Sequence, residues 1–249
     1  MENELRNFWT RYFKLDWKFG IFLLLIICVP RFILVLHANE TGNYSSIGLV
    51  MFISALIPFI FLNKHGQKQI GIKTTKKLQI LVYALTAGIA FSVLLYFLGV
   101  ALYGNTYENW YQYIGKSYNI PAGISAQSKN TMFIVMALTG MTFSPIGEEL
   151  FFRGIVHGSF AKSLGDKKAS VIDSLAFAIT HISHFGLVFV NNKWDFYLIP
   201  AIIWVMSTFF ISILFFKMKS LSGSIWEAVL CHSGFNLGMI YCMFYLEMK

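Results

Sequence analysis

Residues 80–100 read ILVYALTAGIAFSVLLYFLGV, a run without a single charged side chain. A transmembrane helix needs roughly 20 consecutive apolar residues to cross the hydrocarbon core of a bilayer, and this run has that length. Across the whole chain of 249 residues, 56% are hydrophobic and 13% are charged, with a mean hydropathy of +0.60. A soluble domain normally has about a quarter of its residues charged. The sequence therefore predicts a multi-spanning membrane protein.

Working outward from this run, apolar segments recur along the chain and predict an all-α transmembrane helix bundle. We predict seven spans, at residues 19–37, 46–63, 79–103, 131–160, 169–191, 196–216 and 221–246. The fourth contains Pro145 and Gly147, which predicts a kink or break at that point. Residues 1–18 interleave aromatic and basic side chains, a pattern typical of an interfacial amphipathic helix.

Basic and base-poor segments alternate between the predicted spans. The basic segments are the N-terminus and the loops at 64–78, 161–168 and 217–220; the base-poor ones are the loops at 38–45, 104–130 and 192–195. Cytoplasmic loops of membrane proteins are enriched in Lys and Arg. We therefore predict a cytoplasmic N-terminus and an external C-terminus, in a plasma membrane of bacterial type. The net charge of +8 is then explained by the orientation of the chain in the membrane, and we expect no nucleic-acid partner.

Ionisable side chains interrupt the fourth, fifth and seventh spans, although charged groups in a bilayer are costly and usually functional or paired. Glu148, His181 and His232 lie 14, 13 and 13 residues from Lys162, Lys168 and Lys219, which belong to the basic segments. At 1.5 Å per residue, each group lies roughly 20 Å along its helix from that side of the membrane. The three groups therefore share one layer, as a single polar site requires.

Spacing and residue type then indicate hydrolytic chemistry. Glu149 and Arg153 are i,i+4 neighbours on a helix and so are His232 and Asn236, whereas Glu148 points about 100° away from Glu149. A buried carboxylate can act as general base on a water molecule, and imidazole and amide groups can hold that water or donate to an oxyanion. Histidines with a carboxylate also match a zinc site, so a metal stays an open alternative. We expect Arg31 to serve a helix kink or lipid headgroups, and His184 to pack.

Three motifs carry a family resemblance. They are Glu148-Glu149-Leu-Phe-Phe-Arg153, Phe177-Ala-Ile-Thr-His181 and His232-Ser-Gly-Phe-Asn236. With them the chain resembles the CPBP family (CAAX protease and bacteriocin-processing, also called Abi) of intramembrane endopeptidases, over residues 131–240. Family members often have eight spans, so we expect a bundle of about seven to eight with an intramembrane active site. The domain plan is then 1–18 as interfacial helix, 19–130 as N-terminal spans and 131–246 as the CPBP-type protease core.

The resemblance implies a role for each motif residue. Glu148 is similar to the base that activates water, and His181 to the residue that helps to hold it. His232 and Asn236 resemble an oxyanion-stabilising pair, and Glu149 and Arg153 a supporting ion pair. No cofactor is required by this reading, although zinc or another divalent metal at Glu148, His181 and His232 stays open.

We therefore expect an intramembrane endopeptidase that hydrolyses a short peptide or the tail of a membrane-associated protein, in a cavity open to the cytoplasm or inner leaflet. Its partners are that substrate and the lipid bilayer. A prenylated CAAX tail, a bacteriocin leader and a signalling propeptide are all compatible, and the oligomeric state is open. The alternatives are a non-proteolytic immunity or scaffold protein of the same family, and a proton-coupled transporter, which an internal repeat would favour.

Overall fold

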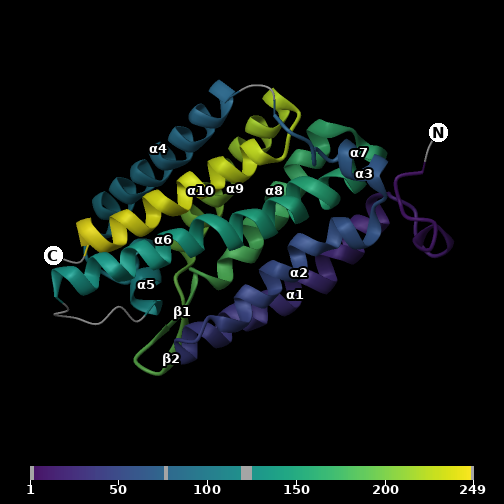
Figure 1. Cartoon of the computed structure of the whole chain (residues 1–249). Coiled ribbons are helices and arrows are strands. Elements are labelled where there is room, and N and C mark those ends of the chain that lie inside the picture. The colour runs from purple at the N-terminus through teal and green to yellow at the C-terminus, as the bar shows by residue number, and fades with distance from the viewer. Residues whose placement is uncertain (1–2, 76–77, 119–124, 248–249) are drawn as a thin grey trace.

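A computed structural model describes residues 3–75, 78–118 and 125–247, and it confirms the predicted all-α membrane-type bundle (Figure 1). Five helices match predicted spans: α1 (Trp17–Thr41), α2 (Ser45–Phe61), α4 (Leu78–Tyr103), α9 (Leu198–Ser222) and α10 (Trp226–Tyr241), the last followed by a π-helical turn (Cys242–Glu247). Within the described residues, four helices are long and apolar enough to cross a membrane. The span count and the orientation stay predictions.

The fourth predicted span is one continuous helical rod. It consists of α6 (Ala126–Glu149), a π-helical segment (Leu150–Val156) and α7 (His157–Leu164). Of the predicted kink or break at Pro145, the break is wrong, because Pro145 lies inside α6 and the irregular segment begins only after Glu149; the kink stays a prediction. Proline leaves the carbonyl four residues earlier without its helical donor. The Ser233 hydroxyl of α10 donates to that carbonyl, Met141 O, at 2.6 Å, which satisfies it inside the bundle.

The fifth predicted span ends much earlier than expected. Helix α8 (Asp166–Thr180) passes into a 3₁₀ turn (His181–Ser183), and an antiparallel hairpin of β1 (Leu187–Val190) and β2 (Lys193–Phe196) follows. The prediction of a helix to residue 191 is therefore wrong. Asn191 and Asn192 have φ values of 52° and 59°, the left-handed pair that a two-residue hairpin turn requires. His181 consequently lies at a helix end.

The N-terminal segment is not the predicted amphipathic helix over 1–18, of which residues 1–2 lie outside the described chain. It contains one 3₁₀ turn (Trp9–Arg11) before α1. Leu5 pairs with Leu62 in a β-bridge, and the Trp9 indole N–H donates to Ile60 O at 2.8 Å. The Trp9 ring also packs on Phe61, with centroids 4.6 Å apart. Trp9 and Phe13 thus pack against Phe61 at the end of α2, whereas Phe8 and Tyr12 are exposed, and no helix arranges these aromatic side chains on one face.

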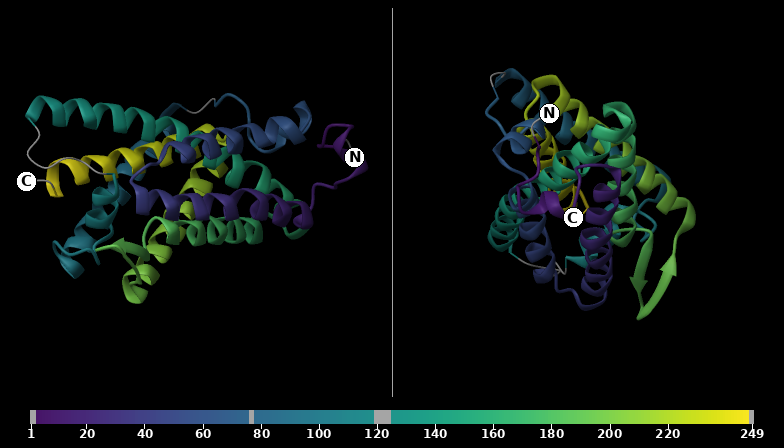
Figure 2. Two further views of the ribbon diagram at one scale, coloured as in Figure 1. Left: turned by 90° about the horizontal axis from the view of Figure 1, so that it is seen from below. Right: turned by 90° about the vertical axis from the view of Figure 1, so that its right-hand side faces the viewer.

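The basic and base-poor segments gather at opposite ends of the bundle, and the two chain ends do the same (Figure 2). At the basic end, Lys162 pairs with Glu4 at 2.5 Å, and the Ser224 hydroxyl donates to Lys73 O near α3 (Lys64–Gln69). At the base-poor end, Asn39 donates to Ser183 O at 2.7 Å, and the Tyr113 hydroxyl of α5 (Trp110–Ser117) accepts from the β1 backbone. We call these two ends of the bundle the basic end and the base-poor end.

Helices α4 and α10 approach closely because small residues face each other. A Cβ at Gly234 would overlap the backbone carbonyl of Leu85, and one at Gly88 would overlap that of Cys231. Small residues at such crossings let two transmembrane backbones pack closely. Since Gly234 lies between His232 and Asn236, this contact fixes the helix that presents both side chains.

Gly234→Leu is expected to lower the melting temperature in detergent and to abolish activity, because the added side chain must separate α10 from α4. Overpacking of this kind costs about 1–3 kcal/mol or more. Thermal unfolding of the purified variant measures it. For the melting temperature, Gly48→Leu is the matched control, since no heavy atom of another described part of the chain lies within 4 Å of a Cβ at Gly48. Equal melting temperatures for the two variants would refute the close crossing.

Candidate active site

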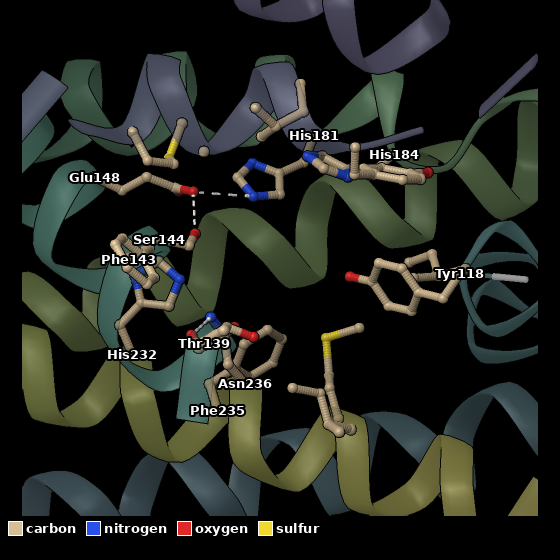
Figure 3. A pocket seen from close by; sticks show the side chains of 18 of the residues that line it. Tyr118, Thr139, Phe143, Ser144, Glu148, His181, His184, His232, Phe235 and Asn236 are labelled. Atoms are coloured by element: carbon tan, nitrogen blue, oxygen red, sulfur yellow. Dashed lines mark hydrogen bonds and ion pairs between the residues drawn. The ribbon is translucent and has the colours of Figure 1, made fainter. Parts of the chain in front are cut away.

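The predicted site residues meet at a cavity of about 430 Å³ inside the bundle (Figure 3). Its walls come from α1, α2, α6, the end of α8, α9 and α10. Glu148, His181, His232 and Asn236 all line it, so the structure brings together the residues that residue counting placed in one layer, while their depth in the bilayer stays a prediction. Glu149 and Arg153 lie behind this wall, and both are fully buried.

Glu148 is held in one orientation by two donors. Its Oε1 accepts from Arg31 Nη2 at 2.8 Å and from the Ser144 hydroxyl at 2.6 Å. Its Oε2 has no hydrogen-bond partner among the described residues. The side chain is only 2% exposed, so the Arg31 charge is what compensates the carboxylate. One oxygen is thus fixed and the other is left for a ligand.

Arg31 is the functional residue that sequence reasoning missed. It comes from α1, is 3% exposed, and lies 117 positions before its partner Glu148. The expected kink or headgroup role is wrong, because the guanidinium points into the bundle. A signal was available: Arg31 lies 13 residues after Lys18, so the same depth count places it in the layer of Glu148.

His181 faces the free oxygen of Glu148. Its Nδ1 lies 2.7 Å from Phe177 O, and because a carbonyl only accepts, Nδ1 carries the proton. In the neutral ring Nε2 is then an acceptor, and it lies 3.9 Å from Glu148 Oε2. The Phe177 ring covers the imidazole, with centroids 4.2 Å apart, because residues four apart lie on one face of a helix. Two acceptors therefore face each other across a gap.

His232 is oriented by Glu149, a contact that the sequence did not predict. Its Nδ1 donates to Glu149 Oε1 at 2.8 Å, and its ring stacks on Phe215 with centroids 4.6 Å apart. The predicted pair of Glu149 with Arg153 is present, with Oε2 and Nε 3.3 Å apart. The glutamate therefore connects the arginine to the histidine and leaves Nε2 of His232 on the cavity side.

Asn236 uses part of its amide to hold helices together. Its Nδ2 donates to Gly140 O of α6 at 2.8 Å. An amide nitrogen carries two N–H donors, so one is left for a ligand. His184 also lines the cavity, with its ring 5.4 Å from that of His181.

Arg153 begins a buried ionic chain that leads away from the cavity. Its guanidinium donates to the Ser212 hydroxyl and lies over the Phe177 ring, 4.5 Å from the centroid. Its Nε is 4.0 Å from Asp173, whose other oxygen is 2.6 Å from His157 Nδ1. His157 is thus buried against an acid beside the basic end.

The end of the cavity away from Glu148 is apolar and aromatic. Tyr44 and Tyr118 pack there, with centroids 5.6 Å apart, and Met239, Ile240 and Met243 complete the wall. The Tyr44 hydroxyl donates to Asn39 at 2.5 Å. Burial raises the pKa of Tyr44 and that of Tyr118, so both hydroxyls stay protonated. The cavity therefore has a polar end and an apolar end.

The residues suggested for a metal make a poor metal site. Among the described residues, no three or more His, Cys, Asp or Glu side chains form a group that could hold a metal ion. The Arg31 guanidinium already occupies Glu148 Oε1 at 2.8 Å. A cation bound to Glu148 would have to displace this positive charge or lie beside it, at a Coulomb cost.

A helical membrane bundle with a buried glutamate facing a histidine in a cavity has the make-up of an intramembrane hydrolase. The sequence model of the type II CAAX prenyl endopeptidase Rce1-like family matches residues 130–238. This match confirms the resemblance drawn from the motifs, and that region belongs to the CPBP family of CAAX-type intramembrane endopeptidases. All three motifs lie within the match, and Arg31 lies outside it. No curated protein matches the chain, and no solved structure does.

Proposed function

We propose that this protein hydrolyses a peptide bond within the membrane by means of a water molecule activated by Glu148. The observation that carries the proposal is the pair of acceptors, Glu148 Oε2 and His181 Nε2, 3.9 Å apart. A water about 2.8 Å from each would donate one hydrogen to the carboxylate and one to the imidazole. Its oxygen lone pairs would then be free to attack a substrate carbonyl in the cavity.

In this mechanism Glu148 removes a proton from the water as the oxygen bonds to the scissile carbonyl carbon. The carbonyl electron pair becomes the oxyanion of a tetrahedral intermediate. Arg31 and Ser144 keep Oε1 engaged, so Oε2 is the basic atom. Glu148 then returns the proton to the amide nitrogen, and the oxyanion electron pair re-forms the C=O bond as the C–N bond breaks. The products are a carboxylic acid, which loses its remaining water proton to solvent, and a free amine.

The oxyanion would be stabilised by α10. When His232 carries a proton on both ring nitrogens, Nδ1–H donates to Glu149 and Nε2–H is left for the oxyanion. The second N–H of Asn236 is the other candidate donor. Donors fixed in advance and shielded from water are the most effective arrangement for such charge. Glu149 and Arg153 act by positioning His232.

The test is direct cleavage by the purified protein in detergent. It is offered three probe peptides: a prenylated peptide ending in a CAAX sequence, a bacteriocin-type leader peptide and an apolar signalling propeptide. Products are identified by mass spectrometry in ¹⁸O-labelled water. We expect one class to be cut at one bond, with the label in the new carboxylate. If all three remain intact, the non-proteolytic scaffold reading is favoured.

Cleavage is expected to continue in the presence of EDTA or 1,10-phenanthroline. The physical reason is that the Arg31 guanidinium, and not a metal ion, compensates the charge of Glu148. The measurement is the cleavage rate before and after chelation, with a zinc protease inhibited in parallel as the control. Loss of activity that returns on adding zinc would overturn this mechanism.

A further inference from the structure

The cavity extends from the site toward only one end of the bundle. Beyond the site its lining comes from Tyr44 and Ser45 at the start of α2, from Tyr118 after α5 and from Met243. All of these belong to the base-poor end. None of the described lining residues belongs to a basic turn, and none is a lysine.

Toward the basic end the path is closed by packed side chains. Every residue of the π-helical segment that follows Glu149, Leu150–Val156, is buried. The Lys219 ammonium donates to Arg153 O at 2.5 Å and ties α9 to this segment. The Phe151 and Phe152 rings pack edge to face, with centroids 5.1 Å apart. A peptide could pass these packed side chains only if the contacts of Arg153 with Ser212 and Asp173 were broken.

The cavity has a mouth on its side, between α2 and α6. Gly48 of α2 and Thr139 and Phe143 of α6 all line the cavity, yet each is itself exposed. Among the residues that the structure describes, no packing partner lies within 4 Å of a Cβ at Gly48, so this rim is open. The faces beside it carry exposed apolar side chains such as Leu49 and Leu138, which suit lipid contact.

We propose that the substrate reaches Glu148 from the base-poor, external side, through the mouth between α2 and α6. This rests on the proposed hydrolysis and names its substrate class: an extended, apolar segment of an exported peptide or surface protein, held in the outer leaflet. The mouth lies beside the base-poor end, where the exposed Ser45 also lines the cavity, so it admits a chain held in the outer leaflet and also water-borne solutes from that side. Among the described residues, the charged side chains of the cavity wall are Arg31 and Glu148, besides its histidines, so acidic or basic substrate residues near the cut are disfavoured. This proposal replaces the expectation from the sequence that the cavity opens to the cytoplasm or inner leaflet.

Cysteine labelling in spheroplasts tests the route. In a Cys28→Ser background, since Cys28 is half-buried and the other two cysteines are buried, three variants are compared. Ser45→Cys reports the rim and Thr208→Cys the cavity interior, because Thr208 is buried yet lines the cavity. Ser220→Cys, exposed at the basic end, is the matched control. The probe is a charged, membrane-impermeant methanethiosulfonate, added before or after permeabilisation.

We expect Ser45→Cys and Thr208→Cys to be labelled in intact spheroplasts, and Ser220→Cys only after permeabilisation. Labelling of Thr208→Cys only after permeabilisation overturns the proposal, and so does its protection under both conditions. Labelling of Ser220→Cys from outside reverses the orientation and overturns it as well. Repeating the labelling with Glu148→Gln separates the two proposals, because access does not depend on chemistry, whereas cleavage does.

Discussion

Glu148→Gln is expected to lower the cleavage rate by about 10²–10⁴-fold, the contribution typical of a general base. An amide cannot accept the proton of the attacking water. Its oxygen can still accept from Arg31 and Ser144, which donate at 2.8 and 2.6 Å, so the fold is expected to persist. The measurement is the turnover of whichever probe peptide the wild-type protein cleaves. Thermal unfolding in detergent verifies that the variant is folded.

The matched control is Glu227→Gln, which removes another fully buried carboxylate, on α10 and outside the cavity lining. It is expected to cleave at the wild-type rate. Wild-type cleavage by a folded Glu148→Gln enzyme would contradict the assignment of the base.

Arg31→Ala is expected to give the largest loss of stability. It leaves the Glu148 carboxylate buried without its ion-pair partner, and breaking a buried pair on one side costs about 3–5 kcal/mol. The measurement is the melting temperature of the purified protein. The cleavage rate should fall too, through kcat and not KM, because Arg31 holds Oε1 and thereby aims Oε2 at the water.

Two further variants separate charge from shape. Adding Glu148→Gln to Arg31→Ala removes the unpaired charge, so part of the lost stability should return. Arg31→Lys keeps the positive charge but not the planar guanidinium. Compared with Arg31→Ala, it should restore most of the melting temperature but a smaller share of kcat. An Arg31→Ala protein with the wild-type melting temperature would show that the ion pair of Arg31 with Glu148 does not contribute to stability.

The sequence was sufficient for the fold class and for the cluster around Glu148, because both depend on local patterns. Long apolar runs predict helices, and counting from the lysines aligned Glu148, His181 and His232 without knowledge of which helices touch. Helical spacing likewise predicted the pair of Glu149 with Arg153, which lies at 3.3 Å.

What the sequence left open depends on contacts between distant segments. The ion pair of Arg31 joins it to Glu148, 117 positions away in the sequence. The hydrogen bond of His232 to Glu149 joins two separate helices, and helical spacing predicts contacts only within one helix. Pro145 predicted a break because the Ser233 hydroxyl that satisfies the freed carbonyl could not be foreseen. The hairpin after His181 was hidden by apolar strand residues that resemble the continuation of a span.

A single aromatic ring contacts three of the groups discussed above. The Phe177 ring lies 4.2 Å from the His181 ring, 4.5 Å from the Arg153 guanidinium and 5.8 Å from the His232 ring. Variation at this residue would disturb the water site, the ionic chain and the oxyanion side together. Tyr44 and Met243, which line the apolar end of the cavity, lie far from Phe177 along the chain. If the proposed hydrolysis holds, substitutions at the apolar end could therefore change which peptides bind while the arrangement of Glu148, His181 and His232 is kept.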